Sequence, residues 1–326
     1  MKGVGSVFRN NMNRMKSRKN YLFSTLAMTI AAMAFAIYFT AAFDMKGSIA
    51  VVTEADEMPI GTKDFRVERL AEVPPKSQLV RGKYDAVIVD QGNGTHKIET
   101  VKGDAFKEKL QQALASPERP QSEEAKRGVG MNILGFLIMF VLLEGMLFMN
   151  LFAEDKANGT LRRVIVSPAS LTSYMLAQSL FCFVILYAPT YVLLVAAQTL
   201  LGLDLGFTLL QYAWLLGLLA ALATAFALFM TAWIDSLDNA MMAAASIIVL
   251  TSILSGSFYT FSHGGLMKVV VSLLPQKQFL NLVQDLEQRT ATAAGSQQIG
   301  YLLVFTAILF VAGWAICRRR SKEGRY

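Results

Sequence analysis

Cysteine and histidine are scarce in this chain, and the common catalytic motifs are missing. The 326 residues include two cysteines, Cys182 and Cys317, and two histidines, His96 and His263. So few thiols and imidazoles offer no disulfide framework and no metal framework. No G-x-x-x-x-G-K-[ST], H-E-x-x-H, C-x-x-C or G-x-S-x-G sequence occurs either. These absences argue against an enzyme and predict that the chain itself binds no metal or nucleotide cofactor.

Charge is also sparse, and its distribution argues against a nucleic-acid partner. Charged residues make up 17% of the chain, 54% of the residues are hydrophobic, and the net charge is +7. No basic stretch is interleaved with aromatic residues, as base stacking would require. The bases instead flank apolar runs, which is typical of membrane orientation signals and of contacts to anionic lipids. They cluster at Arg9, Arg14, Lys16, Arg18 and Lys19 and again at Arg318, Arg319 and Arg320.

Six apolar runs are long enough to cross a bilayer as helices, which need about 20 residues. The first, residues 21–43, exceeds the 7–15 apolar residues of a signal peptide and is interpreted as an uncleaved span. A shorter, broken apolar stretch at 260–296 predicts a re-entrant hairpin or helices on the membrane surface. The chain is therefore predicted to be a polytopic α-helical membrane protein. The other five expected spans are about 129–152, 171–201, 209–234, 240–259 and 299–317.

Residues 44–127 differ from the rest of the chain, because 14 Lys/Arg and 15 Asp/Glu are concentrated there. Short β-branched or alternating runs predict strands, and Gly92-Asn93-Gly94 predicts a hairpin turn. Residues 104–115 have the periodicity of an amphipathic helix. We therefore expect a small α/β domain between the first and second spans. The predicted strands are Ile49–Val52, Phe65–Leu70, Ala86–Val89 and His96–Val101.

The orientation follows from the bases in the short loops, since such residues stay in the cytosol. Residues 1–20 predict an amphipathic helix on the cytoplasmic surface, and 318–326 a basic cytoplasmic tail. Arg162 and Arg163 place the segment 154–170, between the second and third spans, on the same side. Both termini are then cytoplasmic, and the α/β domain is extracellular. The turn Asp235–Asp238 carries no base and is the weakest point of this topology.

The segment 154–170 resembles the cytoplasmic coupling region of the type-2 ABC transporter permeases. That family carries acidic residues, then Gly-Thr-Leu, a basic or polar pair, and Ser-Pro. The layout of the spans resembles the drug- and peptide-antibiotic-exporting branch over essentially the whole chain. At Tyr259-Thr260-Phe261, however, the family usually has a proline, so the shape of 260–296 stays open. The resembling positions are Glu154, Asp155, Lys156, Gly159, Thr160, Leu161, Arg162, Arg163, Ser167 and Pro168.

The resemblance implies that this segment docks onto a separate ABC ATPase subunit, which would bind ATP and Mg. A second permease copy, identical or a sister chain, would complete the transport path within the cell membrane. The expected activity is export of an amphipathic drug, peptide antibiotic or lipid-like molecule. The alternative from another class is a sensor whose extracellular domain detects a ligand without transport. From the residues alone, the segment could also be an ordinary basic loop.

Two polar residues inside the spans are candidates for the translocation pathway, Glu144 and Gln178. An ionisable group within a span is costly and is therefore a functional hypothesis by default. The alternatives for Glu144 are that it reaches the cytosolic interface or bonds to a polar group of a neighbouring helix. For Gln178 the alternative is helix packing.

Overall fold

The computed structural model describes the chain as two compact units, which are treated separately below. The first comprises Met1–Ile37 with Arg127–Tyr326, and the second comprises Tyr38–Lys126. The described residues are 4–43, 48–52, 66–70, 74–75, 79, 84–90, 96–100, 107, 111, 127–165, 170–258, 265–288 and 293–323.

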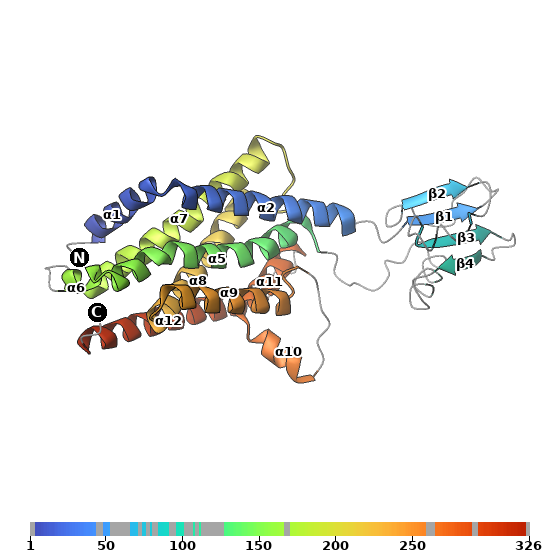
Figure 1. Ribbon diagram of the computed structural model, residues 1–326. Coiled ribbons are helices and arrows are strands. Elements are labelled where there is room, and N and C mark those ends of the chain that lie inside the picture. The colour runs from blue at the N-terminus through green and yellow to red at the C-terminus, as the bar shows by residue number, and fades with distance from the viewer. Residues whose placement is uncertain are drawn as a thin grey trace. The chain divides into compact units, whose positions relative to one another are not determined.

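Within the described residues, six helices are long and apolar enough to cross a membrane, which confirms the predicted fold class (Figure 1). Their ends differ from the expected ones. α5 continues to Ala157, five residues beyond the predicted end of the second span, because no helix breaker precedes Gly159. α9 ends at Leu254, where Gly256 takes a left-handed backbone (φ +82°). The six are α2 (Lys19–Phe43), α5 (Val129–Ala157), α7 (Leu171–Thr199), α8 (Leu209–Trp233), α9 (Leu237–Leu254) and α12 (Ala293–Lys322).

α5 and α8 form the centre of the helical unit, and both are mostly buried, whereas α9 and α12 are mostly exposed. Small residues allow the close approaches. A Cβ at Gly145 of α5 would lie 3.0 Å from the carbonyl oxygen of Ala223 on α8. A Cβ at Gly313 of α12 would lie 3.1 Å from the backbone nitrogen of Phe229 on α8. Within a bilayer, the hydrophobic effect does not drive helices together, so close van der Waals packing at small residues contributes to their association instead.

The described part of this unit also contains four shorter helices: α1 (Val4–Ser17), α6 (Thr160–Ile165), α10 (Gly265–Ser272) and α11 (Pro275–Glu287). α1 packs against α7, with Asn11 and Met15 buried and the Phe8 ring edge-on to that of Phe181. The predicted membrane-surface helix is thus also a packed element of the bundle. α10 and α11 occupy the 260–296 region, and each is too short to cross a bilayer.

The α5 N-terminus is fastened to α9 and α11 by a charged clasp of two residues. Arg127 donates to the carbonyl oxygens of Gly256 (2.8 Å) and Ser257 (3.0 Å). Glu287 accepts from the backbone N–H groups of Gly128 (3.0 Å) and Met131 (3.2 Å), a favourable place for an anion. Burial lowers the pKa of Arg127 to about 10 and raises the pKa of Glu287, although the bonded N–H groups oppose the latter shift.

The second unit contains a four-stranded sheet of order β2-β1-β3-β4, with β1 (Ser48–Val52), β2 (Arg66–Leu70), β3 (Ala86–Asp90) and β4 (His96–Thr100). β1 is parallel to both β2 and β3, whereas β4 is antiparallel to β3 with Ile88 opposite Ile98. All four predicted strands are confirmed. Its core contains Ala50, Leu79, Tyr84 and Val87. The predicted turn at 92–94 and most of the predicted helix at 104–115 lie outside the described residues.

Candidate functional site

The charged segment after α5 begins inside that helix rather than in a loop. Residues 154–156 form its last turn, and Asn158 and Gly159 make the turn into α6. Gly159 has φ +68°, a conformation that side chains with a Cβ rarely adopt. α6 lies at the end of the bundle that also carries the N- and C-termini (Figure 1), called the termini end below. Ser167 and Pro168 lie outside the described residues, and the N-cap of α7 is Ser170.

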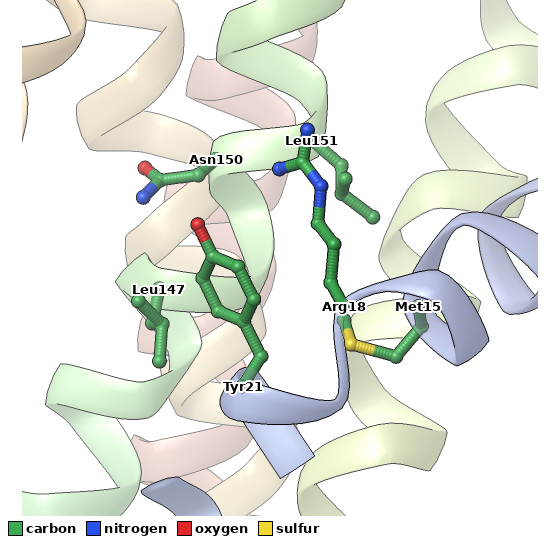
Figure 2. Close-up of a pocket in the computed structure, with 6 residues that line it drawn as sticks. All are labelled: Met15, Arg18, Tyr21, Leu147, Asn150 and Leu151. Atoms are coloured by element: carbon green, nitrogen blue, oxygen red, sulfur yellow. The ribbon is translucent and has the colours of Figure 1, made fainter.

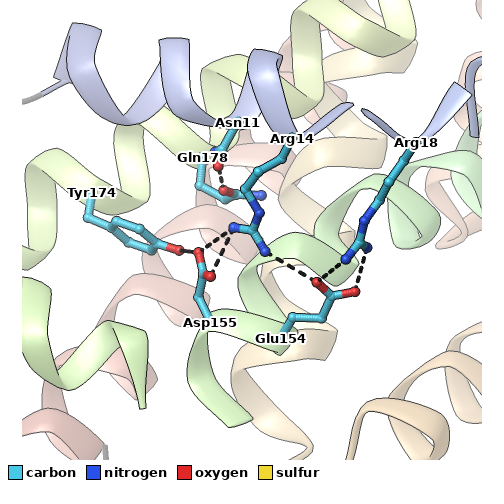
Figure 3. Close-up of polar contacts among 7 residues, drawn as sticks. All are labelled: Asn11, Arg14, Arg18, Glu154, Asp155, Tyr174 and Gln178. Atoms are coloured by element: carbon cyan, nitrogen blue, oxygen red, sulfur yellow. Dashed lines mark hydrogen bonds and ion pairs between the residues drawn. The ribbon is translucent and has the colours of Figure 1, made fainter. Parts of the chain in front are cut away.

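The two acidic residues are held by arginines from the N-terminal region (Figure 3). Arg14 donates to both Asp155 oxygens, at 2.9 and 3.0 Å, and to Glu154 at 3.2 Å. Arg18 makes a two-point pair with Glu154, at 2.6 and 3.0 Å. The hydrogen bonds to Glu154 raise the pKa of Arg18 above its ordinary value. Paired, charge-assisted contacts of this kind are among the stronger hydrogen bonds in proteins.

Asp155 is also tied to α7, because the Tyr174 hydroxyl donates to its second oxygen at 2.5 Å. Its side chain is only 8% exposed, whereas those of Arg14 and Glu154 are 24% and 22% exposed. Figure 3 shows Arg14 between the two carboxylates, with Tyr174 on the far side of Asp155. The acidic pair therefore joins α1, the α1–α2 junction and α7 to the end of α5.

Lys156 points in another direction, toward the end of α8. Its Nζ donates to the carbonyl oxygens of Thr231 (2.8 Å) and Ile234 (2.9 Å), which the end of a helix leaves without intrahelical partners. Arg320 of α12 donates to the Trp233 carbonyl oxygen at 2.9 Å and pairs with Asp235. The α8–α9 turn, which has no base of its own, thus receives its positive charge from α5 and α12.

α6 presents the other part of the segment. Leu161 is fully buried and anchors the helix, whereas Arg162 and Arg163 are exposed. Thr160 is half-buried, and a Cβ at Gly159 would meet no atom within 4 Å. The predicted coupling residues therefore divide into two groups. Glu154, Asp155 and Lys156 make contacts inside the bundle. The half-buried Gly159 and Thr160 and the exposed Arg162 and Arg163 form a strip at its surface, called the α6 strip below.

The sequence analysis assigned the basic residues near the N-terminus to topology and missed Arg14, Arg18 and Tyr174 as partners of the segment. One signal was available: two acids at the end of a span need positive partners, and two arginines at helical spacing precede the first span. Figure 2 shows the side chains around the α1–α2 junction where it faces α5. Its walls leave almost no enclosed space, so it is a packing contact rather than a ligand pocket. They are formed by Met15, Arg18, Tyr21, Leu147, Asn150 and Leu151.

The two pathway candidates have different surroundings. Gln178 is fully buried and accepts a 2.6 Å hydrogen bond from the Asn11 side chain of α1, so it contributes to packing (Figure 3). Glu144 is 1% exposed, and neither of its oxygens has a hydrogen-bond partner among the described residues. The described residues thus supply no polar partner for this carboxyl group, and its place in a translocation pathway stays a prediction.

No group of three or more His, Cys, Asp or Glu side chains within the described ranges is placed to hold a metal ion. Comparison with known proteins gives one family. A family model described as "ABC-2 family transporter protein" matches residues 76–315, well over half of the chain. No curated protein matches the chain.

Proposed function

The chain belongs to the ABC-2 transporter family and is a multi-pass membrane permease of an ABC transporter, and on this premise we propose that it is the exporting subunit that a separate ATPase drives through the α6 strip. The family implies an ABC ATPase partner. ATP and Mg would bind to that partner. A second permease copy, identical or a sister chain, would complete the path.

The observation that carries this proposal is the division of the segment 154–165. The α6 strip is accessible and basic at Arg162 and Arg163. The residues immediately before it belong to α5, the most buried of the spans, which packs against α7, α8, α9 and α11. A partner that displaces α6 would therefore act on the central helix of the bundle. This is the arrangement that a coupling element needs, since force applied at the strip reaches most spans through one helix.

The proposed orientation rests on the bases at the termini end. The α1 region, the α6 strip and the end of α12 all carry arginines, and positive residues near spans favour the cytosol. The termini and the α6 strip would then face the cytosol, and the sheet-containing unit would lie outside the cell. This side is also where an ATPase and its ATP would be found.

The substrate proposal rests on Glu144 and on the family. A buried carboxyl group within a span, without a hydrogen-bond partner among the described residues, favours a substrate that brings a hydrogen-bond donor or a positive charge. The spans around it are apolar, which suits an amphipathic molecule such as a drug, a peptide antibiotic or a lipid-like compound. Replacing Glu144 by Gln keeps its shape and is expected to change export while leaving ATPase association intact.

The decisive experiment is a mild-detergent purification of the tagged permease from native membranes, with mass spectrometry of what accompanies it. An ATPase subunit is expected with the wild type and is expected to be lost from the R162E/R163E double variant. R319E reverses an exposed base at the same end of the bundle and serves as the matched control. Retention of the ATPase by the double variant would refute the role of the α6 strip. Recovery with a signalling kinase instead would favour a sensor.

A further inference from the structure

An apolar groove runs along the outside of the helical unit between α7 and α12, with α8 as its floor. Its larger part has a volume of about 460 Å³, and a smaller part of about 130 Å³ continues toward the termini end. The two parts share Leu176, Phe310 and Val311, so they form one continuous groove. Among the described residues, no charged side chain lines either part, and the polar groups of the larger part are the hydroxyls of Ser179, Thr224 and Thr306.

The groove exists because α8 holds its two walls apart. α7 and α12 each pack closely on α8 but touch one another little. The floor is formed by small side chains, including Ala221 and Ala225. Near the termini end the walls are bridged by a hydrogen bond from the Trp314 indole N–H to the Thr172 hydroxyl (3.3 Å). The groove is therefore built by the same close packing that holds the bundle together.

The length of the groove matches one leaflet of a bilayer. Its lining along α12 runs from Leu303 to Trp314. At 1.5 Å per residue, these eleven steps span about 16 Å. The hydrocarbon core of a bilayer is about 30 Å thick, so the groove is about as deep as one layer of acyl chains.

A basic residue stands at the mouth of the groove. The guanidinium of Arg318 lies over the ring of Trp314, 5.2 Å from its centre. Its neighbours are used elsewhere, since Arg319 pairs with Glu323 and Arg320 with Asp235. Arg318 is exposed and has no ion-pair partner in the part of the chain that the structure describes. An arginine beside a tryptophan suits the headgroup level of a membrane, where aromatic side chains collect.

We propose that this groove is a binding site for an anionic phospholipid of the cytoplasmic leaflet, with one acyl chain between α7 and α12 and the headgroup phosphate on Arg318. The occupant follows from the combination of an uncharged channel one leaflet deep and a single uncompensated arginine at its mouth. The cytoplasmic leaflet is the anionic one, and basic recesses between helices on that side bind such headgroups. The choice of leaflet rests on the orientation given under the proposed function. The lipid site itself does not depend on an ATPase.

The test uses the full-length permease purified alone, with native mass spectrometry of bound lipid. Phosphatidylglycerol and phosphatidylcholine with identical chains are offered in equal amounts. The wild type is expected to prefer phosphatidylglycerol about fivefold, because one basic residue at the surface contributes about 1 kcal/mol toward an anionic headgroup. R318A is expected to lose this preference. R319A, at the neighbouring exposed position, is expected to keep it.

A second variant tests the groove independently of the charge. A307F places a large ring in the channel and is expected to reduce retention of both lipids, whereas A315F, at an exposed alanine of the same helix outside the lining, is the control. A thermal unfolding curve for each variant shows whether it is folded. If A307F does not fold, the R318A result still tests the proposal. Inorganic phosphate is expected not to displace the lipid.

Several outcomes would overturn the proposal. One is an unchanged phosphatidylglycerol preference in R318A, and another is full lipid retention by a folded A307F. The third is displacement by phosphate alone, which would mean that Arg318 binds free anions without a chain in the groove. A co-purified exported compound or a second permease copy lost in A307F would name a different occupant and would equally refute the lipid. Because no ATPase is present, a failed ATPase association leaves these results unaffected.

Discussion

The replacement of Asp155 by Asn tests whether the acidic end of α5 acts inside the bundle. The carboxylate accepts two bonds from Arg14, at 2.9 and 3.0 Å, and one from Tyr174. Asn keeps the shape but removes the charge. Charge-assisted hydrogen bonds contribute about 1.5–3 kcal/mol each, and Arg14 keeps its contact to Glu154, so we expect a loss of about 2 kcal/mol. At 2–4 °C per kcal/mol, the melting temperature should fall by about 4–8 °C.

The assay is thermal unfolding of the purified permease in detergent, with E323Q as the matched control. Glu323 pairs with Arg319 on the exposed surface of α12, where an ion pair contributes about 0–1 kcal/mol. A double-mutant cycle with R14M should give a coupling energy of about 1 kcal/mol or more between Arg14 and Asp155. A D155N protein as stable as E323Q, or single changes that simply add, would refute an internal role for this pair.

The same variant also separates the two parts of the segment. If Asp155 acts only inside the bundle, folded D155N should still recover the ATPase from membranes, whereas R162E/R163E should not. The two variants should therefore be affected in opposite ways, one in stability and the other in association. Loss of the ATPase from a D155N protein of normal stability would show that the acid itself contacts the partner.

Three further predictions follow from the same end of the bundle and from the clasp at the opposite end. G159V should destabilise the protein by about 1–2 kcal/mol, because the site has space for a side chain but its φ of +68° strains a β-branched residue. G159N tolerates that conformation and should lose less stability. Thermal unfolding and ATPase recovery would compare the two variants. K156M should lower the stability by about 2 kcal/mol, because the Thr231 and Ile234 carbonyl oxygens lose their charged donor. K322M, at the exposed end of α12, should leave the stability unchanged. Equal melting temperatures for the two variants would contradict this prediction. Burial raises the pKa of Glu287 above its ordinary 4.5, so the folded protein holds this proton at a pH where the unfolded chain has released it. The Glu287 contribution to stability should therefore fall as the pH rises from about 4.5 through the raised pKa, and E287Q should remove that slope from a series of melting temperatures.

The fold was largely predictable because the bilayer imposes a strong rule on the sequence. A spanning helix needs a long apolar run, and each of the six runs became a helix. The strands were also predictable, because β-branched residues and alternating patterns are typical of strands. The strands lie at 48–52, 66–70, 86–90 and 96–100. The helix ends were less predictable. α5 runs through Glu154 and Asp155 to Ala157, and the arginines that pair with these acids, Arg14 and Arg18, are about 140 residues away in the sequence.

The residues of the candidate site lie on α6 and at the end of α5, and their coupling role stays a prediction. The direction in which each side chain points could not be read from the sequence. The sequence around Glu154 and Asp155 does not distinguish carboxylates that face a partner protein from carboxylates that pair with arginines of the same chain. The deciding contact is with α1, which the sequence indicated only as a membrane-surface helix. The amphipathic pattern of residues 1–20 did not reveal that this helix packs against α7, with Phe8 beside Phe181.

This internal use of the acids constrains how a partner could move the bundle. Arg14 bridges Glu154 and Asp155, and Arg18 holds Glu154 from the α1–α2 junction, so α1 and the end of α5 are joined by several charge-assisted bonds. A force on the α6 strip would reach α5 through a turn of two residues, Asn158 and Gly159, and would pass to α1 through these bonds. α7 would receive it through Tyr174, and α8 through Lys156. These contacts form a continuous physical path from α6 through the end of α5 to α1, α7 and α8.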